Sequence, residues 1–546
     1  MNKEVIQVNI GFKLEIMCER RWCAVVKHAG LGALIGFLVL GVLSSFPGHA
    51  FAAQPQVGVY AYTSEVVIFW DPSETFSNEI IWMHNVYETL IRYDPLTDNF
   101  EPVLATSYEV SEDGLVWKFY LRRNVKFHTG GIMNAHAVKF SIERTITRGM
   151  GASYIWDPVD QIEVIDEYTV AFHLKYPAPL DLIASAAYAA FIFDPNFSDH
   201  DWFLEGNDSG TGPYTIESHV GAEIIVLKRF PEYWGGWSGK HFDKVVFQWV
   251  AEPATRRMML EAGTADFTNM LPITEIEALK AVPGMEIVRT PSFQNLVALF
   301  NTAKSPDQPI SNPLVRKALA YALPYEDIVE DVLGGFGRQS RGVVPYGLWG
   351  YSERVKQYTH SVETAKVLLA QAGYPEGGFK LLITYVGGDE NERRVAELWK
   401  SELAKLGIDL EIRGMPWDAQ ITLGHATDPN ARQDIFLFYW WPDYAHPHSF
   451  LSAMFETLEP PLFNFSYYKN PLFDTLINKA SALAALNRTE AINLYVEAQN
   501  ILMEDAAGVA IYDLEYVRAK RASLKGYVDN PLYSHVVFCY YCYREE

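Results

Sequence analysis

Cysteine is scarce in this sequence, with 4 residues among 546. That number is too small for a disulfide scaffold in a chain of this length. Cys18 and Cys23 lie near the amino terminus, whereas Cys539 and Cys542 form a Cys-x-x-Cys pair near the carboxyl terminus. Structural zinc needs four ligands, so we interpret Cys539 and Cys542 as an oxidised or idle pair and not as a redox centre.

Basic residues are also in the minority. The chain has 45 Lys and Arg against 67 Asp and Glu, which gives a formal net charge of −22 at pH 7. Nucleic acids and anionic membranes attract basic surfaces, so this balance argues against both partners. The 49% hydrophobic and 21% charged residues are typical of a soluble globular protein. At roughly 150 residues per domain, the length allows about three domains.

Long hydrophobic runs are missing except for one near the start, Ala29 to Leu43. It is shorter than the ~20 residues that a helix needs to cross a membrane. Basic residues precede it, and Ala50-Phe51-Ala52 follows with small residues spaced as at a cleavage site. This pattern predicts a secretory signal over 1–52, cleaved after about Ala52, and a periplasmic mature chain.

Enzyme motifs are absent from the sequence as well. It has no glycine-rich nucleotide loop after a strand, no Gly-x-Ser-x-Gly and no His-Glu-x-x-His. We therefore expect that the protein is not an enzyme, and we assign no catalytic residue, no metal ligand and no cofactor. A secreted hydrolase stays open as an alternative of a different class, because spacing alone does not reveal a working pair of carboxylates. A periplasmic chaperone or sensor partner is a third alternative.

Strand and helix patterns alternate along the rest of the chain. Residues 116–122 alternate between apolar and polar positions, as a half-buried strand does. Asn134 can cap a helix over 135–147, and Asn312-Pro313 can open another over 314–323. The pattern predicts a mixed α/β protein whose lobes share strands. Further strands are expected over 168–174, 223–229, 244–250, 408–412 and 434–438, and further helices over 362–372, 392–406 and 488–505.

One segment, Phe438 to His448, is unusually aromatic. Five aromatic residues and two histidines surround one carboxylate, Asp443, directly after an apolar strand, and Pro442 and Pro447 stop that strand from continuing and the segment from forming a helix. Loops at strand ends are where α/β proteins bind ligands. Aromatic faces and a partly desolvated carboxylate hold an ammonium group well. The alternative is an aromatic corner in a core, with Asp443 capping the following turn.

Several short motifs follow one another in order along the mature chain. With this set the chain resembles, over nearly its full length, the family-5 extracellular solute-binding proteins of ABC transporters, which include dipeptide, oligopeptide and nickel binders. The motifs are Asp71-Pro72, Asn85-Val86-Tyr87-Glu88-Thr89-Leu90, Glu101 to Ala105, Asp113 to Trp117, Val125-Lys126-Phe127-His128, Gly210-Thr211-Gly212-Pro213-Tyr214, Tyr233-Trp234, Asn301-Thr302, Val315 to Leu319, Ala365 to Leu369 and Ala372 to Pro375.

The resemblance implies an α/β fold of two lobes, the periplasmic-binding-protein fold of class II, cluster C type, with an extra domain inserted in the first lobe. Strands over Leu296 to Asn301 and Gly508 to Asp513 would cross between the lobes, which would close on a ligand between them. The expected boundaries are 53–77, 201–298 and 511–546 for lobe I, 78–200 for the extra domain II, and 299–510 for lobe III.

The resemblance also implies a function. The protein would be a monomeric receptor of an ABC importer that captures a peptide or related small organic solute and delivers it to permease and ATPase subunits in the inner membrane. Asp443 falls on the acid that holds the α-ammonium of bound peptides in peptide-binding members. Trp440, Trp441 and Tyr444 would form the walls of the site. Further ligand contacts are expected from His446, Phe76 and Gln294.

Two departures from the family pattern concern the ligand. Dipeptide binders carry an arginine for the ligand carboxylate at a place that falls near Val386-Gly387, and the nearest arginines here, Arg393 and Arg394, have the pattern of solvated helix charges. A strict dipeptide ligand is therefore disfavoured, and longer peptides stay open. His446 and His448 echo nickel-binding members, but their spacing is not a standard metal pair. Oligosaccharide and nickel or metal-chelate receptors are the alternatives within the family.

Overall fold

The computed structural model divides into two compact units, 1–54 and 55–546. In the first, β1 (Glu4–Ile10) pairs antiparallel with β2 (Phe12–Cys18). The apolar run of the predicted secretory signal and its cleavage site lie outside the described residues. None of the helices within the described ranges is long and apolar enough to cross a membrane. The structure describes residues 4–10, 12–18, 55–63, 69–95, 97, 99–221, 223–461, 463–533 and 535–545.

The second unit is built on one 11-stranded mixed sheet with the order β10-β11-β12-β3-β13-β19-β14-β18-β16-β17, and β15 pairs with β19. The strands predicted over 223–229, 244–250, 408–412 and 434–438 are confirmed within three residues at each end. The strands are β3 (Val57–Tyr62), β10 (Tyr214–Val220), β11 (Ile224–Arg229), β12 (Lys244–Trp249), β13 (Phe267–Thr268), β14 (Met285–Phe300), β15 (Gly337–Gln339), β16 (Phe379–Val386), β17 (Ile408–Met415), β18 (Ile435–Trp440) and β19 (Gly508–Arg521).

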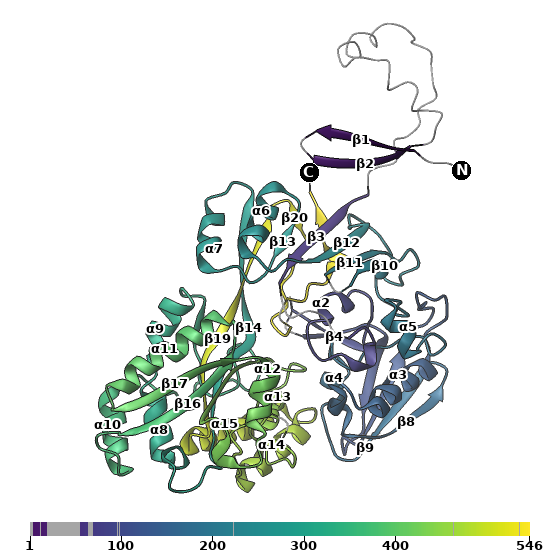
Figure 1. Ribbon diagram of the computed structural model, residues 1–546. Helices are drawn as coiled ribbons and strands as arrows, with labels where there is room; N and C mark the ends of the chain where they lie inside the picture. The colour runs from purple at the N-terminus through teal and green to yellow at the C-terminus, as the bar shows by residue number, and fades with distance from the viewer. Residues whose placement is uncertain are drawn as a thin grey trace, which may run out of the picture. The chain divides into compact units, whose positions relative to one another are not determined.

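Two long strands, β14 and β19, join the halves of this sheet (Figure 1). The last part of β19 pairs with β13, while the second part of β14, from Asn295 on, pairs with β18. Both strands are longer than the predicted crossing strands. In β14 the residues from Phe293 to Phe300 are all buried, whereas the first part is largely half-exposed. The sequence pattern therefore indicates only the buried part of the strand.

A separate four-stranded antiparallel sheet has the order β6-β7-β9-β8. Trp117, Phe119 and Leu121 of β7 point into its core, as the alternation predicts. The helix α3 (Ala135–Arg148) packs against this sheet, and the side chain of Asn134 accepts the hydrogen bond from Ala137 N–H that a helix cap makes. The strands are β6 (Ala105–Val110), β7 (Val116–Leu121), β8 (Val159–Asp166) and β9 (Thr169–Leu174), and β4 (Ile91–Asp94) pairs with β5 (Asn99–Pro102) beside them in the sequence.

Most of the regular secondary structure after β14 is helical. The predicted caps Asn312 and Ser361 are confirmed, since each side chain accepts a backbone N–H of the first turn. The predicted helix from 392 starts two residues earlier, because Asp389 and not a later residue caps it. The main helices are α6 (Pro253–Ala262), α7 (Ile273–Lys280), α8 (Pro313–Tyr321), α10 (Val362–Gln371), α11 (Glu390–Ala404), α12 (Trp417–Gly424), α13 (Pro447–Phe455), α14 (Pro471–Leu483) and α15 (Arg488–Asp505).

Three of the ordered sequence motifs meet at the buried carboxylate of Glu88. Thr211 Oγ1 and Trp234 Nε1 each donate to Oε2 at 2.8 Å, and Tyr233 Oη donates to Oε1 at 2.9 Å. Burial raises the pKa of Glu88, and these donors oppose the shift. Motifs that lie more than a hundred residues apart in the chain are thus joined by one polar centre, whose loss would leave buried donors unpaired.

The glycines of the Gly210-Thr211-Gly212 motif let the backbone approach this centre. A Cβ on Gly210 would lie 2.1 Å from the carbonyl oxygen of Val86, and one on Gly212 would lie 2.7 Å from that of Asn85. Backbone atoms cannot move aside as a flexible side chain can. These two positions therefore require glycine because of space.

We predict that Gly210→Ala lowers the stability of the protein by about 3 kcal/mol or prevents folding, because the added methyl group collides with backbone. Gly149 is a suitable control, since it has open space around the Cβ position and only a left-handed φ of +61°. Gly149→Ala should cost about 1 kcal/mol. Thermal unfolding of the two variants measures the difference, and equal losses would contradict the close-approach explanation.

Candidate ligand-binding site

The aromatic segment begins where β18 ends. β18 lies beside β14, with Trp440 opposite Asn295, and the chain then runs through a loop to α13. The strand does not continue past the prolines, as predicted, since β18 ends at Trp440. Pro447 is the first residue of α13, where a missing N–H leaves no bond unmade. His446 caps this helix, since its Nδ1 accepts the N–H of His448 at 2.9 Å.

Asp443 lies in the middle of this loop and contacts residues from distant parts of the chain. Tyr154 Oη donates to its Oδ1 at 2.9 Å, and Ser449 Oγ donates to Oδ2 at 3.2 Å. The backbone carbonyl of Asp443 accepts from Tyr533 Oη at 2.9 Å. Tyr154 belongs to a short 3-10 turn (η2, Ser153–Trp156), and Tyr533 to the carboxyl-terminal segment. The loop therefore joins three separate stretches of sequence.

The carboxyl group of Asp443 is an uncompensated charge. Burial raises its pKa from 3.8 to about 6, although the hydroxyls of Tyr154 and Ser449 favour the ionised form. None of the ion pairs found among the described residues includes Asp443. A carboxylate in such surroundings gains more from a cation than a hydrated carboxylate does.

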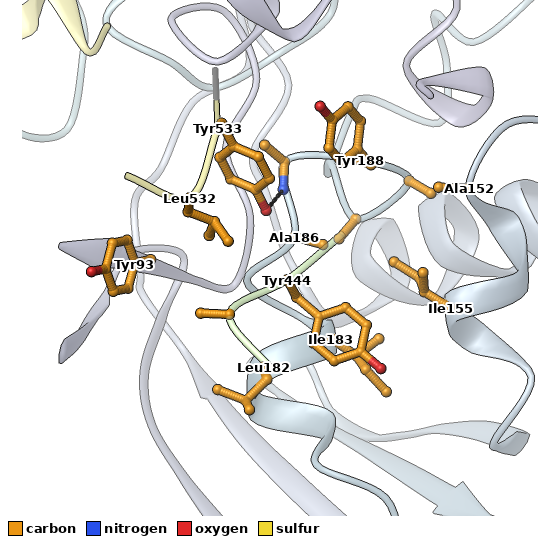
Figure 2. Packing of buried hydrophobic residues seen from close by; sticks show 14 of the residues in the cluster. Tyr93, Ala152, Ile155, Leu182, Ile183, Ala186, Tyr188, Tyr444, Leu532 and Tyr533 are labelled. Carbon is orange, nitrogen blue, oxygen red and sulfur yellow. Dashed lines mark hydrogen bonds between the residues drawn. The ribbon is translucent and has the colours of Figure 1, made fainter. Parts of the chain in front are cut away.

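Tyrosines from other segments pack against this loop, which itself contributes Trp441 and Tyr444. Tyr188 and Tyr533 meet edge to face at 5.3 Å between ring centroids, and the Tyr533 hydroxyl accepts the N–H of Ala187 at 2.8 Å, the bond drawn in Figure 2. The indole of Trp441 hydrogen-bonds the hydroxyl of Tyr188. Tyr444 is buried in the same apolar cluster, which includes Leu182 and Ile183 (Figure 2). The site thus offers aromatic faces and hydroxyls around one acid.

A second buried acid, Glu79, belongs to these surroundings. Its Oε1 accepts the backbone N–H of Phe76 and, at 2.8 Å, that of Ser77, while its Oε2 has no hydrogen-bond partner among the described residues. Burial raises its pKa. Glu79 and Asp443 are both among the acids whose charge adds to the raised pKa of Tyr188, after burial and Tyr533.

The four other predicted ligand residues are Trp440, His446, Phe76 and Gln294, and each has its own surroundings. Trp440 is buried and packs edge to face on Phe463 at 5.0 Å. His446 is fully buried, with Trp349 at 4.6 Å. Phe76 is 41% exposed, and Gln294 is buried in β14 at the register shift that precedes Asn295. The structure brings Asp443, Trp441 and Tyr444 together, and the ligand roles of all seven residues stay predictions.

The predicted absence of a carboxylate-binding arginine can be examined at the end of β16. The N–H of Val386 donates to Glu392 Oε2 at 2.7 Å, and burial raises the pKa of Glu392 to about 9. Arg393 forms ion pairs with two glutamates of its own helix, α11, and Arg394 donates to the carbonyl of Asp331. Both arginines thus make the surface contacts expected of solvated helix charges.

One group of residues has the composition of a metal site. Asp71, Glu74 and His200 bring their ligand atoms close together. Arg144 already binds Asp71 through both carboxylate oxygens, at 2.7 and 2.6 Å, and Arg148 binds Glu74. A metal ion would have to displace two guanidinium groups, so this cluster is better explained as an ion-pair network that ties α3 to the segment before α2 (Ile80–Met83).

Comparison with known proteins identifies the family. Residues 99–459 match the family described as "Bacterial extracellular solute-binding proteins, family 5 Middle". The chain is 30% identical, over 478 residues, to the "Probable D,D-dipeptide-binding periplasmic protein DdpA" of Escherichia coli (strain K12), covering 85% of this chain and 90% of that protein. The chain belongs to this family.

Other solute-binding proteins are similar along most of their length. Heme-binding protein A of Haemophilus influenzae is 27% identical over 482 residues, which is 82% of this chain and 85% of that protein. A solved periplasmic binding protein of Helicobacter pylori, DppA in complex with the peptide STSA, has a TM-score of 0.76 at 27% identity and covers 90% of this chain and 98% of its own. The expected α/β two-lobe fold of family 5 solute-binding proteins is thereby confirmed.

Sequence reasoning missed two hydrogen-bond partners of Asp443, Tyr154 and Tyr533, and the nearby Tyr188 and Glu79. Each lies in a segment with no unusual composition, and only the fold brings them to the loop. Ser449 carried a weak signal, because it follows Asp443 by six residues across a turn that two prolines define.

We predict that Asp443→Asn stabilises the ligand-free protein at pH 8 but not at pH 4. A raised carboxyl pKa means that the folded state favours the proton, so stability falls as pH rises from 3.8 to about 6 and stays lower above it. Removing the charge should recover up to about 3 kcal/mol at pH 8. Thermal unfolding across pH measures this, with Asp409→Asn as a surface control because Asp409 pairs with Lys380 in solvent.

A stability gain of the Asp443→Asn variant that is the same at pH 4 and pH 8 would contradict an ionised, uncompensated Asp443. A gain in the Asp409→Asn control would assign the effect to overall charge.

Proposed function

We propose that this protein is the exported receptor of an ABC importer, and that it binds a peptide or related small organic solute through the ligand's amino group. The single observation that carries the proposal is the buried carboxylate of Asp443, which has hydroxyl partners and no cationic partner in the described part of the chain. Family membership supports the receptor class, and the predicted secretory signal supports export with cleavage after about Ala52.

The aromatic residues around Asp443 indicate how the proposed ligand would lie. An α-ammonium on the carboxylate would lie among the rings of Trp441, Tyr188 and Tyr533, which favour a cation over their faces. The hydroxyls of Tyr154 and Ser449, which now donate to Asp443, fix the orientation of the carboxylate. The second buried acid, Glu79, adds negative potential to the same surroundings.

We further propose that the ligand acts by joining the two lobes. With lobe I as 53–77, 201–298 and 511–546, domain II as 78–200 and lobe III as 299–510, Asp443 would belong to lobe III, Tyr533 to lobe I and Tyr154 to domain II. Ligand contacts on both sides would stabilise the closed form through β14 and β19, and permease and ATPase subunits of the inner membrane would respond to that form.

The absence of an arginine near Val386 supports peptides longer than a dipeptide. Instead of a guanidinium, this position has the buried Glu392, which cannot attract a ligand carboxylate. The related proteins named above carry different ligands in their names, namely a D,D-dipeptide, heme and the peptide STSA. The chain would act as a monomer that returns its ligand chemically unchanged.

The first experiment measures the mass of any ligand that the protein retains after purification. Native mass spectrometry of the freshly purified chain should show a bound mass that fits a peptide. Titration calorimetry with trialanine to pentaalanine should then show binding, and the N-acetylated peptides should bind at least 100-fold more weakly because they lack the ammonium group. Tight binding of an oligosaccharide or a nickel–histidine chelate, with no binding of any peptide, would overturn the peptide assignment, and consumption of the ligand would overturn the receptor assignment.

We predict that Asp443→Ala abolishes binding of peptides with a free amino group. The expected loss is 2–5 kcal/mol, typical of removing one partner from a buried charge pair. Asp409→Asn is the matched surface control and should bind as the unchanged protein does. Unaltered affinity of the Asp443→Ala variant would remove Asp443 as the cation anchor.

A further inference from the structure

Cys539 and Cys542 lie on one turn of 3-10 helix, η6 (Cys539–Tyr541), close to the carboxyl terminus. The N–H of Cys542 donates to the carbonyl of Cys539 at 3.0 Å, which closes the turn. In a 3-10 helix the side chains of residues three apart are eclipsed. Cys539 and Cys542 are 1% and 0% exposed, whereas Tyr541 between them is 50% exposed. Both thiols therefore point to the same, buried side.

Both cysteines are free thiols in this structure and lie beside each other on the turn. The neighbouring thiol of Cys542, together with burial, raises the pKa of the Cys539 thiol. Their other sulfur contacts are weak and long, 3.6 Å to the carbonyl of Val537 and 3.7 Å to that of Gly526. A rise of about 2.0 Å per residue places the two Cα atoms about 6 Å apart, inside the range that a disulfide bridges.

We propose that Cys539 and Cys542 form a disulfide bond in the exported protein. The proposal rests on the export that is part of the proposed function, because disulfides persist in oxidising compartments. One thiolate attacks the disulfide of an oxidant, either glutathione disulfide or a dithiol oxidase, and forms a mixed disulfide. The second thiolate then attacks the protein sulfur of that bond. The two cysteines lose two protons and two electrons, and the oxidant takes up both and leaves as two thiols.

Burial sets the order of events. Because neither sulfur is accessible in the folded protein, the bond must form before the carboxyl-terminal segment docks. Docking then places the N–H of Cys539 on Asn85 Oδ1 at 2.7 Å and the N–H of Phe242 on the carbonyl of Cys542 at 3.2 Å. Tyr533, which reaches Asp443, lies in the same segment. The bond closes only a short loop, so its effect on overall stability should be small, and its role is to fix the turn at the end of this segment.

The test uses the full chain in two arms. In one arm the chain is exported through its own leader; in the other it is unfolded and refolded in a buffer of oxidised and reduced glutathione. Each product is denatured in urea with N-ethylmaleimide and no reductant, then digested with trypsin. Cleavage after Lys525 and Arg544 yields one fragment with both cysteines. We expect this fragment without any maleimide, lighter by two hydrogens, and with two maleimides only when reductant precedes the label.

The result that overturns the proposal is a fragment with two maleimides from the refolded chain, since this arm does not depend on export. The location and intact mass of the chain in the first arm test export separately. Cys539→Ser supplies the matched control, because the remaining thiol of Cys542 should then take one label. A glutathione trapped on Cys542 in that variant would be the mixed disulfide expected without its second thiol, whereas a disulfide from Cys542 to Cys18 or Cys23 in the unaltered refolded chain would refute the intramolecular pair.

Discussion

The buried carboxylate of Asp443 is the feature on which the site depends. It lies in the loop after β18, the strand that pairs with β14. The partners of its carboxyl group come from a 3-10 turn almost three hundred residues earlier and from the first turn of α13. Burial without a cation gives it a pKa of about 6, so the ligand-free protein keeps an electrostatic deficit there. In the proposed site a cationic ligand would remove that deficit, so the free energy of binding would be most favourable for a ligand with a positive charge.

The rest of the scaffold keeps this carboxylate in place. β14 and β19 connect the two halves of the main sheet. The loop of Asp443 starts at the end of β18, which pairs with β14. Glu88 joins Thr211, Tyr233 and Trp234 in one polar centre, and its backbone pairs with that of Ile192, four residues after Tyr188. The carboxyl-terminal segment adds Tyr533 and ends at the cysteine turn. Each of these parts is far in sequence from the loop that it supports.

Local signals predicted much of this from the sequence. Asn134, Asn312 and Ser361 cap the expected helices because capping depends on a few neighbouring residues. The loop around Asp443 was recognisable from its composition and its place after an apolar strand. The helix α13 that begins at Pro447 was not predicted, because a proline that stops one element can also be the first residue of the next.

Tertiary features were not predictable in the same way. The hydroxyls of Tyr154, Tyr188 and Tyr533 reach the loop only through the fold, and no spacing along the chain reports that. Burial of Glu79 and Glu392 was equally hidden, since the sequence shows an acid but not the dielectric around it. The ordered motifs that indicated the family turned out to include the three that meet at Glu88, so their physical basis is packing and not ligand contact.

The most direct test of the central claim is the number of protons released when trialanine binds. Calorimetry at pH 5 and pH 7, in buffers of different ionisation enthalpy, measures it. With a pKa of about 6 in the free protein, Asp443 must lose its proton to hold the ammonium group, so the account predicts release of nearly one proton at pH 5 and almost none at pH 7, and none at either pH for Asp443→Asn. Binding at pH 5 without proton release in the unaltered protein would contradict it.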